Sequence, residues 1–276
     1  MKFSIVTPSY RNSDWLKLCI ASVADQQVEH EHIVQDAGSD DGTLEWLRGD
    51  PRVDLVVEPD GGMYDAINRG LRRSSGDIVA HLNCDEQYLP GALSLVAEFF
   101  AAHPRIEVLF GDAVAVNMEG EYLWHRKMVC PRLWHTWTYH LATLTCGTFF
   151  RRSVIERRGL YFDTRWRYVG DGDWMLRALQ QKVAMDRLRR FTSVFTHTGE
   201  NLSMQGRARE ETRRYNREAP APARALRPLV RVHHFARRLW GGAFFQRPFD
   251  FELYTRHSAG QRIRRHVAAP TTRWRW

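Results

Sequence analysis

The feature that most constrains the fold is an alternation of strand-like and helix-like segments over residues 3–110. Short runs of β-branched and apolar residues are separated by segments whose apolar residues recur every three or four positions. This alternation is typical of a mostly parallel sheet whose strands are joined by crossover helices. The expected strands are 3–7, 32–35, 53–57, 78–82 and 106–110, and the expected helices are 14–27, 43–48, 63–73 and 88–102.

Beyond residue 110 the pattern becomes mixed. Residues 122–129, 145–151 and 184–195 have the composition of strands, whereas 171–181 has helical spacing. We therefore expect an α/β fold with a Rossmann-like, mostly parallel sheet flanked by helices. An Ala-Pro repeat at 219–223 indicates a linker.

Charge is concentrated after this linker. Residues 219–276 contain 12 Arg, no Lys, one Asp and one Glu, a formal net charge of +10, whereas the whole chain has +8. The difference leaves residues 1–218 with a net charge of −2. The main body therefore has no basic face for nucleic acid, and we expect no nucleic-acid partner.

Other features indicate the compartment. The four cysteines are scattered and form no Cys-x-x-Cys pair, which argues against a zinc site or a disulfide framework and favours a reducing environment. The chain opens directly into a strand-like run, so we expect no secretory signal. No apolar run approaches the ~20 residues of a membrane span.

Carboxylates follow two of the expected strands. Asp85 and Glu86 come after 78–82, and Asp36 comes after 32–35. In an open α/β sheet, ligands bind at the carboxyl ends of the strands. Two adjacent acids repel each other, and a divalent cation that also holds a phosphate would relieve this. Alternatively, these acids only form turns or stabilise a helix N-terminus.

The glycine pattern argues against two common classes of nucleotide-binding enzyme. The chain has neither a phosphate-binding loop nor a Gly-x-Gly-x-x-Gly fingerprint, so ATPase and dehydrogenase functions are disfavoured. It does have a Gly61-Gly62 pair before the helix expected at 63–73, and such a pair allows close backbone approach to a ligand.

Four ordered motifs, spread over about residues 1–205, carry a family resemblance. They are Ser4-Ile5-Val6-Thr7-Pro8-Ser9-Tyr10, the Asp-Ala-Gly-Ser-Asp-Asp-Gly-Thr turn at 36–43, the Gly-Gly-Met-Tyr-Asp-Ala-Ile-Asn-Arg-Gly segment at 61–70, and Leu-Asn-Cys-Asp-Glu-Gln-Tyr-Leu-Pro-Gly-Ala-Leu at 82–93. Together they resemble the family 2 glycosyltransferases of the GT-A fold, especially bacterial enzymes of cell-surface polysaccharide assembly.

The resemblance implies an inverting, metal-dependent, hexosyltransferase-like enzyme. Its donor would be a nucleotide sugar, a UDP-sugar by family habit, and its acceptor a hydroxyl of a glycan or lipid-linked sugar. Residues 1–218 would form the GT-A catalytic domain, with a nucleotide-binding half at about 1–112 and an acceptor-binding half at about 113–218. Residues 219–276 would form a basic, aromatic-rich extension.

The same resemblance assigns roles to individual residues. Asp171 matches the catalytic base, at a place where Gly170 replaces a common Glu. Metal binding, by Mn²⁺ or Mg²⁺, falls to Asp85, Glu86 and His197, although an isolated His is more often only a surface residue. Asp173 and Trp174 would position the acceptor, or Asp173 would be structural. The residues assigned to the nucleotide are Thr7, Pro8, Tyr10, Asp36, Gly62, Asp65 and Asn83.

The C-terminal extension has three interpretations. Residues 226–243 form an expected amphipathic helix with an apolar row that includes Leu229, Val232 and Leu239, beside a basic row. The helix could lie on an anionic membrane surface, which predicts a cytoplasmic protein attached to the inner face of the bacterial membrane. It could instead bind a partner or a second copy of the chain, or pack back on the catalytic domain.

Two alternative functions remain open at this point. A metal-dependent nucleotidyltransferase would need a basic residue near its N-terminal loop, and Arg11 is the only candidate in residues 7–14. A catalytically inactive GT-A-like binding module is the other alternative, because Asn83 and Gly170 depart from the family pattern.

Overall fold

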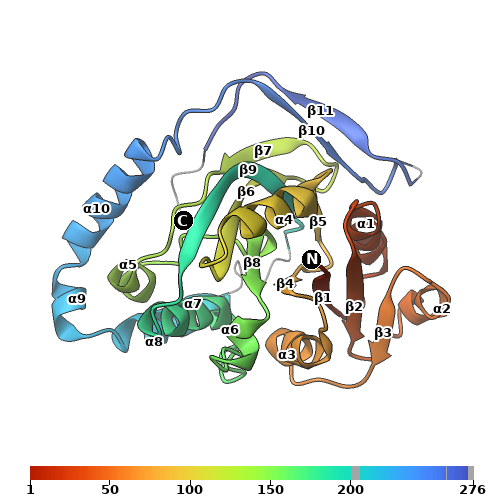
Figure 1. Cartoon of the computed structure of the whole chain (residues 1–276), viewed down its shortest axis with the longest axis horizontal. Coiled ribbons are helices and arrows are strands. Elements are labelled where there is room, and N and C mark those ends of the chain that lie inside the picture. Colours follow the sequence, from red (N-terminus) through yellow and green to blue (C-terminus); the bar gives the residue numbers. More distant parts are fainter. Residues whose placement is uncertain (200–205, 259, 273–276) are drawn as a thin grey trace.

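The computed structural model describes residues 1–199, 206–258 and 260–272 (Figure 1). The strands are β1 (Phe3–Ser9), β2 (His30–Asp36), β3 (Asp54–Val57), β4 (Ile78–His81), β5 (Glu86–Tyr88), β6 (Val108–Val116), β7 (Tyr122–Arg126), β8 (Thr148–Arg151), β9 (Met185–Thr196), β10 (Phe249–Leu253) and β11 (Ile263–Val267). The helices are α1 (Ser13–Ala24), α2 (Thr43–Leu47), α3 (Met63–Arg73), α4 (Ala92–Ala102), α5 (Leu133–Thr138), α6 (Ser153–Glu156), α7 (Gly170–Gln180), α8 (Gly206–Arg217), α9 (Ala221–Ala225) and α10 (Arg227–Trp240), with a 3₁₀ turn η1 (Thr145–Gly147).

A mixed sheet forms the centre of the molecule. Its order is β3-β2-β1-β4-β8-β6-β9-β5, with β7 paired to β6. Strands β1 to β4 are mutually parallel, β8 runs antiparallel between β4 and β6, and β9 is parallel to β6. The strands expected between residues 3 and 82 are all present, with ends shifted by one or two residues. The predicted α/β class and parallel first half are therefore confirmed.

Helices cover both faces of this sheet. Figure 1 shows α1 and α4 on one side and α3, α6 and α7 on the other. The core between the layers is built from fully buried residues such as Ile5 and Phe149 of the sheet, Val96 of α4 and Ile67 of α3. Burial on both faces explains why the strands have near-continuous apolar runs instead of alternating polar and apolar residues.

One predicted helix boundary is wrong. The helix expected at 88–102 begins only at Ala92, and residues 86–88 form strand β5 instead. This short strand pairs antiparallel with β9, where Glu86 lies opposite Phe195. A partner so distant in sequence leaves no local signal. It also means that Asp85 precedes a strand and Glu86 begins it, so the interpretation that they stabilise a helix N-terminus is wrong.

The C-terminal extension packs against the main body of the protein. Strands β10 and β11 form an antiparallel hairpin, and Phe251, Leu253 and Val267 pack on β6 and β9 side chains such as Val114 and Val194. Polar contacts fix the hairpin further: the side-chain amide of Gln87 forms two hydrogen bonds with the backbone of Tyr254, and Arg262 forms an ion pair with Asp25 at 2.6 Å. The last residues, including Trp274 and Trp276, lie outside the described part of the chain.

The expected linker is partly helical, because α9 occupies residues 221–225. The helix expected at 226–243 is present as α10, but its orientation is unusual. His234 and Arg238 on its polar side are buried, whereas Leu229, Val232 and Trp240 are 64%, 66% and 86% exposed. The polar side of α10 therefore faces the protein, while an apolar row faces outward. Among the described residues no helix has both the length and the apolar composition needed to cross a bilayer.

Candidate active site

The candidate site lies at one edge of the sheet, where parallel strands end. Ser9 at the end of β1 pairs with Asp36 at the end of β2, and Asp36 pairs with Val57 at the end of β3. Strand β4 runs in the same direction beside β1 and leads into Asn83. The predicted placement of Asp36 and of the loop after β4 on one sheet edge is therefore confirmed, as expected for parallel strands.

Asp36 organises the loop that follows its strand. It is completely buried, and its two carboxylate oxygens accept hydrogen bonds from the Ser9 hydroxyl, the Ser39 hydroxyl and the backbone N–H groups of Gly38 and Ser39, at 2.7–2.9 Å. These four bonds occupy the acceptor positions of the carboxylate. In this structure Asp36 therefore forms the turn, and a nucleobase would reach it only by displacing one of the two hydroxyl groups.

The loop after β4 contains the adjacent acids. Glu86 is 1% exposed, and its Oε2 accepts a hydrogen bond from the backbone N–H of Asn83 at 2.9 Å. Burial, with repulsion from Asp85, raises the pKa of Glu86, and burial raises the pKa of Asp85. Glu86 thus supports the loop from inside, while Asp85 is the more exposed of the two carboxylates.

Cys84 shows that the two acidic loops are neighbours. Its thiol donates a hydrogen bond to the carbonyl oxygen of Pro8 at 3.0 Å. Burial raises the pKa of this thiol first, and the nearby carboxylates of Asp85 and Asp36 raise it further. The hydrogen bond between Cys84 and Pro8 therefore places the loop after β4 beside the end of β1.

The loop around Asp85 contains oxygen atoms of the type that a hard divalent cation binds. Two buried side-chain oxygens, Oδ1 of Asn83 and Oε1 of Glu86, have no hydrogen-bond partner in the described structure. Together with the Asp85 carboxylate they provide the oxygen ligands that Mg²⁺ and Mn²⁺ prefer. His197 follows β9 two residues after Phe195, the strand partner of Glu86, and its ring packs against Trp124 at 5.5 Å. It therefore comes directly after the strand that pairs with β5, but among the described residues the ligand atoms of Asp85, Glu86 and His197 do not all lie within 4.8 Å of one another.

Helix α3 begins at the same sheet edge. Gly62 precedes it with φ 120°, a conformation that favours glycine. Asp65 accepts a hydrogen bond from the Gly61 N–H at 3.0 Å and forms an ion pair with Arg69 at 2.8 Å. Asp65 therefore shapes the turn, and the Gly61-Gly62 backbone is the part of this segment that can approach a ligand.

Asp171 is joined to α3 through Tyr64. The backbone N–H of Asp171 donates to the Tyr64 hydroxyl oxygen at 3.2 Å, and this hydroxyl lies 3.5 Å from Oδ1 of Asp171. Burial raises the pKa of the Asp171 carboxyl, which suits a general base better than the ordinary value near 3.8. Tyr64 thus connects the start of α7 with the start of α3, next to Gly62.

Steric crowding explains why the residue before Asp171 is a glycine. A Cβ atom at Gly170 would lie 2.6 Å from Cε2 of Tyr64, far inside van der Waals contact. The Tyr64 ring is held in place by stacking on Phe162, with ring centroids 5.2 Å apart. Gly170 therefore departs from the family pattern because Tyr64 fills the space of a side chain.

Several predicted site residues have structural positions instead. The Thr7 hydroxyl is buried and lies 2.9 Å from Nε2 of His32, so its side chain is unavailable to a nucleotide. Asp173 is buried in an ion pair with Arg177 at 2.8 Å. The predicted acceptor role of Trp174 does not agree with its position, because it is 3% exposed and its indole N–H donates to the Leu160 carbonyl. Tyr10, by contrast, is 53% exposed at the sheet edge.

The residues that connect Asp171 to the sheet were not among those predicted from the sequence. Asn68 on α3 forms two hydrogen bonds of 2.8 Å with the backbone of Phe162, and Phe162 stacks on both Tyr64 and Trp174. The available signal was the presence of Asn68 in mid-helix, where it is a poor helix former. Arg11, the candidate phosphate contact of a nucleotidyltransferase, forms an ion pair with Asp40.

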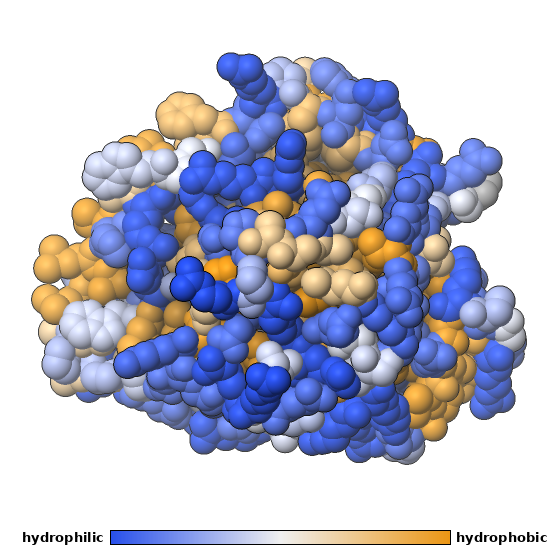
Figure 2. Space-filling model, viewed as in Figure 1, coloured by the Kyte–Doolittle hydropathy of each residue, from blue (hydrophilic) through white to orange (hydrophobic). Residues whose placement is uncertain are grey.

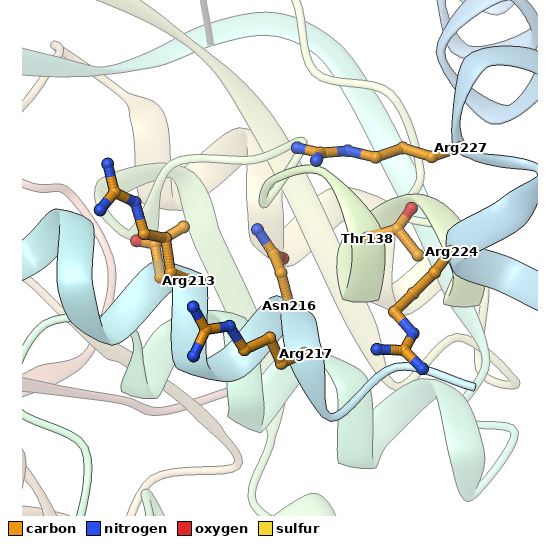
Figure 3. A pocket seen from close by; sticks show the side chains of 7 residues that line it. Thr138, Arg213, Asn216, Arg217, Arg224 and Arg227 are labelled. Atoms are coloured by element: carbon orange, nitrogen blue, oxygen red, sulfur yellow. The ribbon is translucent and has the colours of Figure 1, made fainter. Parts of the chain in front are cut away.

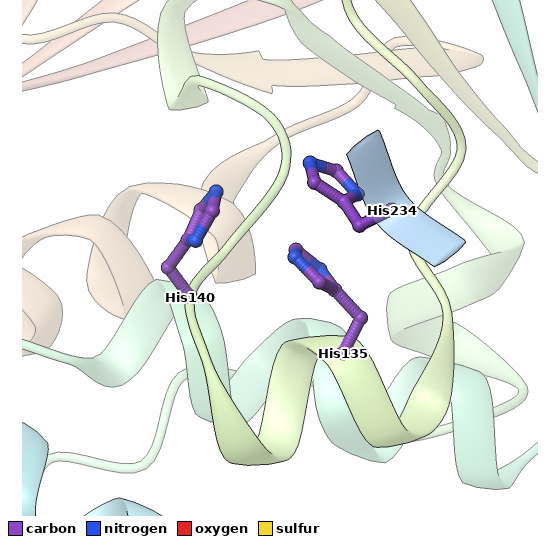
Figure 4. A group of neighbouring side chains, drawn as sticks. All are labelled: His135, His140 and His234. Atoms are coloured by element: carbon purple, nitrogen blue, oxygen red, sulfur yellow. The ribbon is translucent and has the colours of Figure 1, made fainter. Parts of the chain in front are cut away.

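A histidine cluster lies away from this edge, between α5 and α10. His135, His140 and His234 place side-chain nitrogens within 4.8 Å of one another (Figure 4). Their positions do not favour a cation. The rings of His135 and His234 stack at 3.7 Å and 16°, so their in-plane lone pairs do not converge, and burial together with nearby arginines, including Arg237 and Arg238, lowers the pKa of His135 to about 3. The cluster is best explained as a neutral contact that holds α10 on α5.

Comparison with known proteins decides the family. Residues 4–159 match the family model described as Glycosyl transferase family 2. This match covers more than half of the chain and includes the ends of β1, β2, β3 and β4, whereas Asp171 and His197 lie beyond it.

The chain belongs to glycosyl transferase family 2.

Two mycobacterial glycosyltransferases are similar in sequence to this enzyme. A PGL/p-HBAD biosynthesis glycosyltransferase of Mycobacterium bovis is 26% identical over 193 residues, which is 67% of this chain and 72% of the relative. An uncharacterized glycosyltransferase of Mycobacterium tuberculosis is 33% identical over 188 residues, which is 63% of this chain and 68% of the relative.

Solved structures confirm the GT-A architecture of this glycosyltransferase. TarS 1–349 of S. aureus, determined in complex with UDP-GlcNAc, has a TM-score of 0.61 at 18% identity and covers 87% of this chain and 73% of that one. The mannosyltransferase PcManGT of Pyrobaculum calidifontis, in complex with GDP-Man and Mn²⁺, has a TM-score of 0.54 at 17% identity. The match covers 86% of this chain and 69% of that one. A second TarS 1–349 structure is covered over only 60% of its length.

Proposed function

We propose that this family 2 glycosyltransferase transfers a sugar, with inversion, from a nucleotide sugar to a hydroxyl of a glycan or lipid-linked acceptor. The observation that best supports this proposal is the position of Asp171. Tyr64 links it to α3, which begins at the sheet edge that bears Asp85. A UDP-sugar is the proposed donor, because TarS was solved with UDP-GlcNAc. The GDP-Man complex of PcManGT makes a GDP-sugar the donor to test beside it.

Asp171 is the proposed general base. Its carboxylate would take the proton from the attacking acceptor hydroxyl, a contribution of about 10²–10⁴-fold to the rate. The Tyr64 hydroxyl and the Gly172 N–H, which donates to Oδ1 at 2.8 Å, hold the carboxylate in place. In this role the carboxylate forms no bond to the sugar. The acceptor hydroxyl would attack the anomeric carbon directly and displace the nucleotide in one step.

Asp85 is the proposed principal ligand of Mn²⁺ or Mg²⁺, with Asn83, Glu86 and His197 around it. When bound, such an ion neutralises charge on the leaving diphosphate. The Gly61-Gly62 backbone, Pro8 and Tyr10 would contact the nucleotide, and Asp36 would hold the loop beside it. Trp124, which packs on His197, would complete the wall on the β9 side.

The first experiment tests the base. Asp171→Asn should lower the transfer rate by about 10²–10⁴-fold while UDP binding stays within a few-fold of wild type. Asp173→Asn is the matched control on the same helix, because this acid is in an ion pair with Arg177. It should lower stability but leave most of the activity of the folded enzyme. Near-normal transfer by Asp171→Asn would refute the assignment.

The second experiment tests the ion. We expect Mn²⁺ to increase the thermal shift produced by UDP in the wild type, and Asp85→Ala to remove this increase. Glu86→Gln should retain most of this increase in thermal shift. Burial raises the pKa of Glu86, and glutamine has the same shape as the protonated side chain. An equal response to UDP with Mn²⁺ and with EDTA in the wild type would contradict a metal site.

We also propose that α10 attaches the enzyme to an anionic membrane surface on the cytoplasmic side. This is supported by the outward apolar row of α10 and by the net charge of +10 on residues 219–276. Figure 2 shows hydrophobic surface along the side of the molecule that carries α9 and α10. Such attachment suits an acceptor whose sugar is linked to a lipid.

The membrane proposal has a matched test. Leu229→Ser/Val232→Ser should lower co-sedimentation with vesicles that contain anionic lipid. Leu123→Ser, at a 39% exposed position on β7, is the control and should bind like wild type. If the wild type does not sediment with vesicles but is dimeric by light scattering, and the double variant is monomeric, the row binds a second copy instead.

A further inference from the structure

A basic cavity lies between α5, α8, α9 and α10. Its volume is about 510 Å³, and it is lined by Thr138, Thr212, Arg213, Asn216, Arg217, Arg224 and Arg227 (Figure 3). The arginines come from three elements: two from α8, one from α9 and one from the first position of α10. Figure 3 shows these side chains around the hollow between α8 and the α9–α10 segment.

The four arginines have no carboxylate partner among the described residues. Several arginines elsewhere do form ion pairs, as in Arg158 with Glu107, Arg165 with Asp163 and Arg264 with Asp250. No acid lines the cavity. Glu211 of α8 does not face the cavity. Its carboxylate accepts hydrogen bonds from the backbone N–H groups of residues 167–169.

Four exposed arginines line the hollow with no acid among the other lining residues, and an anion bound between them would reduce the repulsion of their charges. Guanidinium groups match phosphate oxygens because each can donate two parallel hydrogen bonds. The side chain of Asn216 forms no hydrogen bond to another described residue and supplies further donors beside Arg213 and Arg217. A formal charge of +4 and a cavity of this size fit a phosphate or pyrophosphate group better than a single carboxylate.

We propose that this arginine cavity is a binding site for a phosphate- or pyrophosphate-bearing ligand. The exposed apolar row of α10 begins at Leu229, two residues after Arg227, so the ligand's phosphate could belong to a lipid headgroup at the membrane. The same chemistry would hold the phosphate of a soluble ligand. The site does not depend on the assignment of Asp171 or Asp85.

Binding of inorganic pyrophosphate to the full chain tests the site, measured by calorimetry in EDTA so that no metal-bridged site at Asp85 contributes. The wild type should show saturable binding that weakens as salt rises. Arg217→Gln/Arg224→Gln should weaken it about a hundredfold, at about tenfold for each lost charge-assisted contact. The matched control is Arg207→Gln/Arg209→Gln, which removes the same charge from exposed positions of α8 outside the cavity and should bind within about twofold of wild type.

The result that would overturn the proposal is equal binding by the two double variants, or no binding by the wild type. A second arm separates the sources of phosphate. If pyrophosphate competes with anionic vesicles and the cavity variant loses vesicle binding, the phosphate belongs to a lipid headgroup. If the variant loses pyrophosphate but sediments with vesicles like wild type, the ligand is soluble. Either result supports the cavity, and UDP binding with Mn²⁺ reports separately on the catalytic site.

Discussion

Substitution of Gly170 tests how the base is positioned. A Cβ atom there would lie 2.6, 2.8 and 2.9 Å from three atoms of the Tyr64 ring, whereas ordinary contacts begin near 3.4 Å. The ring must therefore move by most of an ångström, but it is 4% exposed and stacked on Phe162. Overpacking of this kind costs about 1–3 kcal/mol.

Gly172→Ala is the control for this substitution. Its Cβ would lie 3.9 Å from the Tyr215 ring, an ordinary contact, so this change should be neutral or stabilising by up to about 1 kcal/mol. Urea unfolding should therefore separate Gly170→Ala from Gly172→Ala by about 2 kcal/mol. Gly170→Ala should also lower kcat, because a displaced Tyr64 no longer holds Asp171.

A second substitution makes this reasoning falsifiable. In a Tyr64→Leu background the ring is absent, so the penalty of Gly170→Ala should fall to less than about 0.5 kcal/mol. If Gly170→Ala and Gly172→Ala have equal stability, or if the penalty persists without the ring, the steric explanation of Gly170 is wrong.

Three further predictions concern the same framework. Asn68→Ala should lower the free energy of unfolding by about 2–4 kcal/mol in urea titrations, because it leaves the buried N–H and C=O of Phe162 unpaired; a loss below about 0.5 kcal/mol would contradict this. Burial lowers the pKa of His32 to about 3, below the ordinary 6.5, so its contribution to stability is present above pH 6.5 and is lost as the pH falls. Between pH 7 and 5 this loss is about 2 kcal/mol, and His32→Gln should reduce the pH dependence of unfolding by that amount. Because burial raises the pKa of Asp171, the acid limb of kcat/KM should lie above pH 3.8; a limb at or below the ordinary aspartate value would refute the burial of the base.

The sequence alone determined the framework of the fold and the position of the acids along it. The spacing of apolar residues and the runs of β-branched residues identified β1 to β4 and α3, because these signals are local. Parallel strands then required Asp36 and the loop after β4 to share an edge. The basic, amphipathic character of α10 was also visible, since it depends only on composition and spacing.

Tertiary structure decided what the side chains at those positions do. Asp36 uses its acceptor positions on its own turn and on Ser9 of β1, Glu86 points inward, and Trp174 is buried, although each was expected to face a ligand. Strand β5 exists only because β9 pairs with it, and Gly170 is required only because Tyr64 occupies the adjacent space. A sequence pattern gives the direction of a residue relative to its own element, but burial and hydrogen bonding depend on neighbours that are distant in the chain.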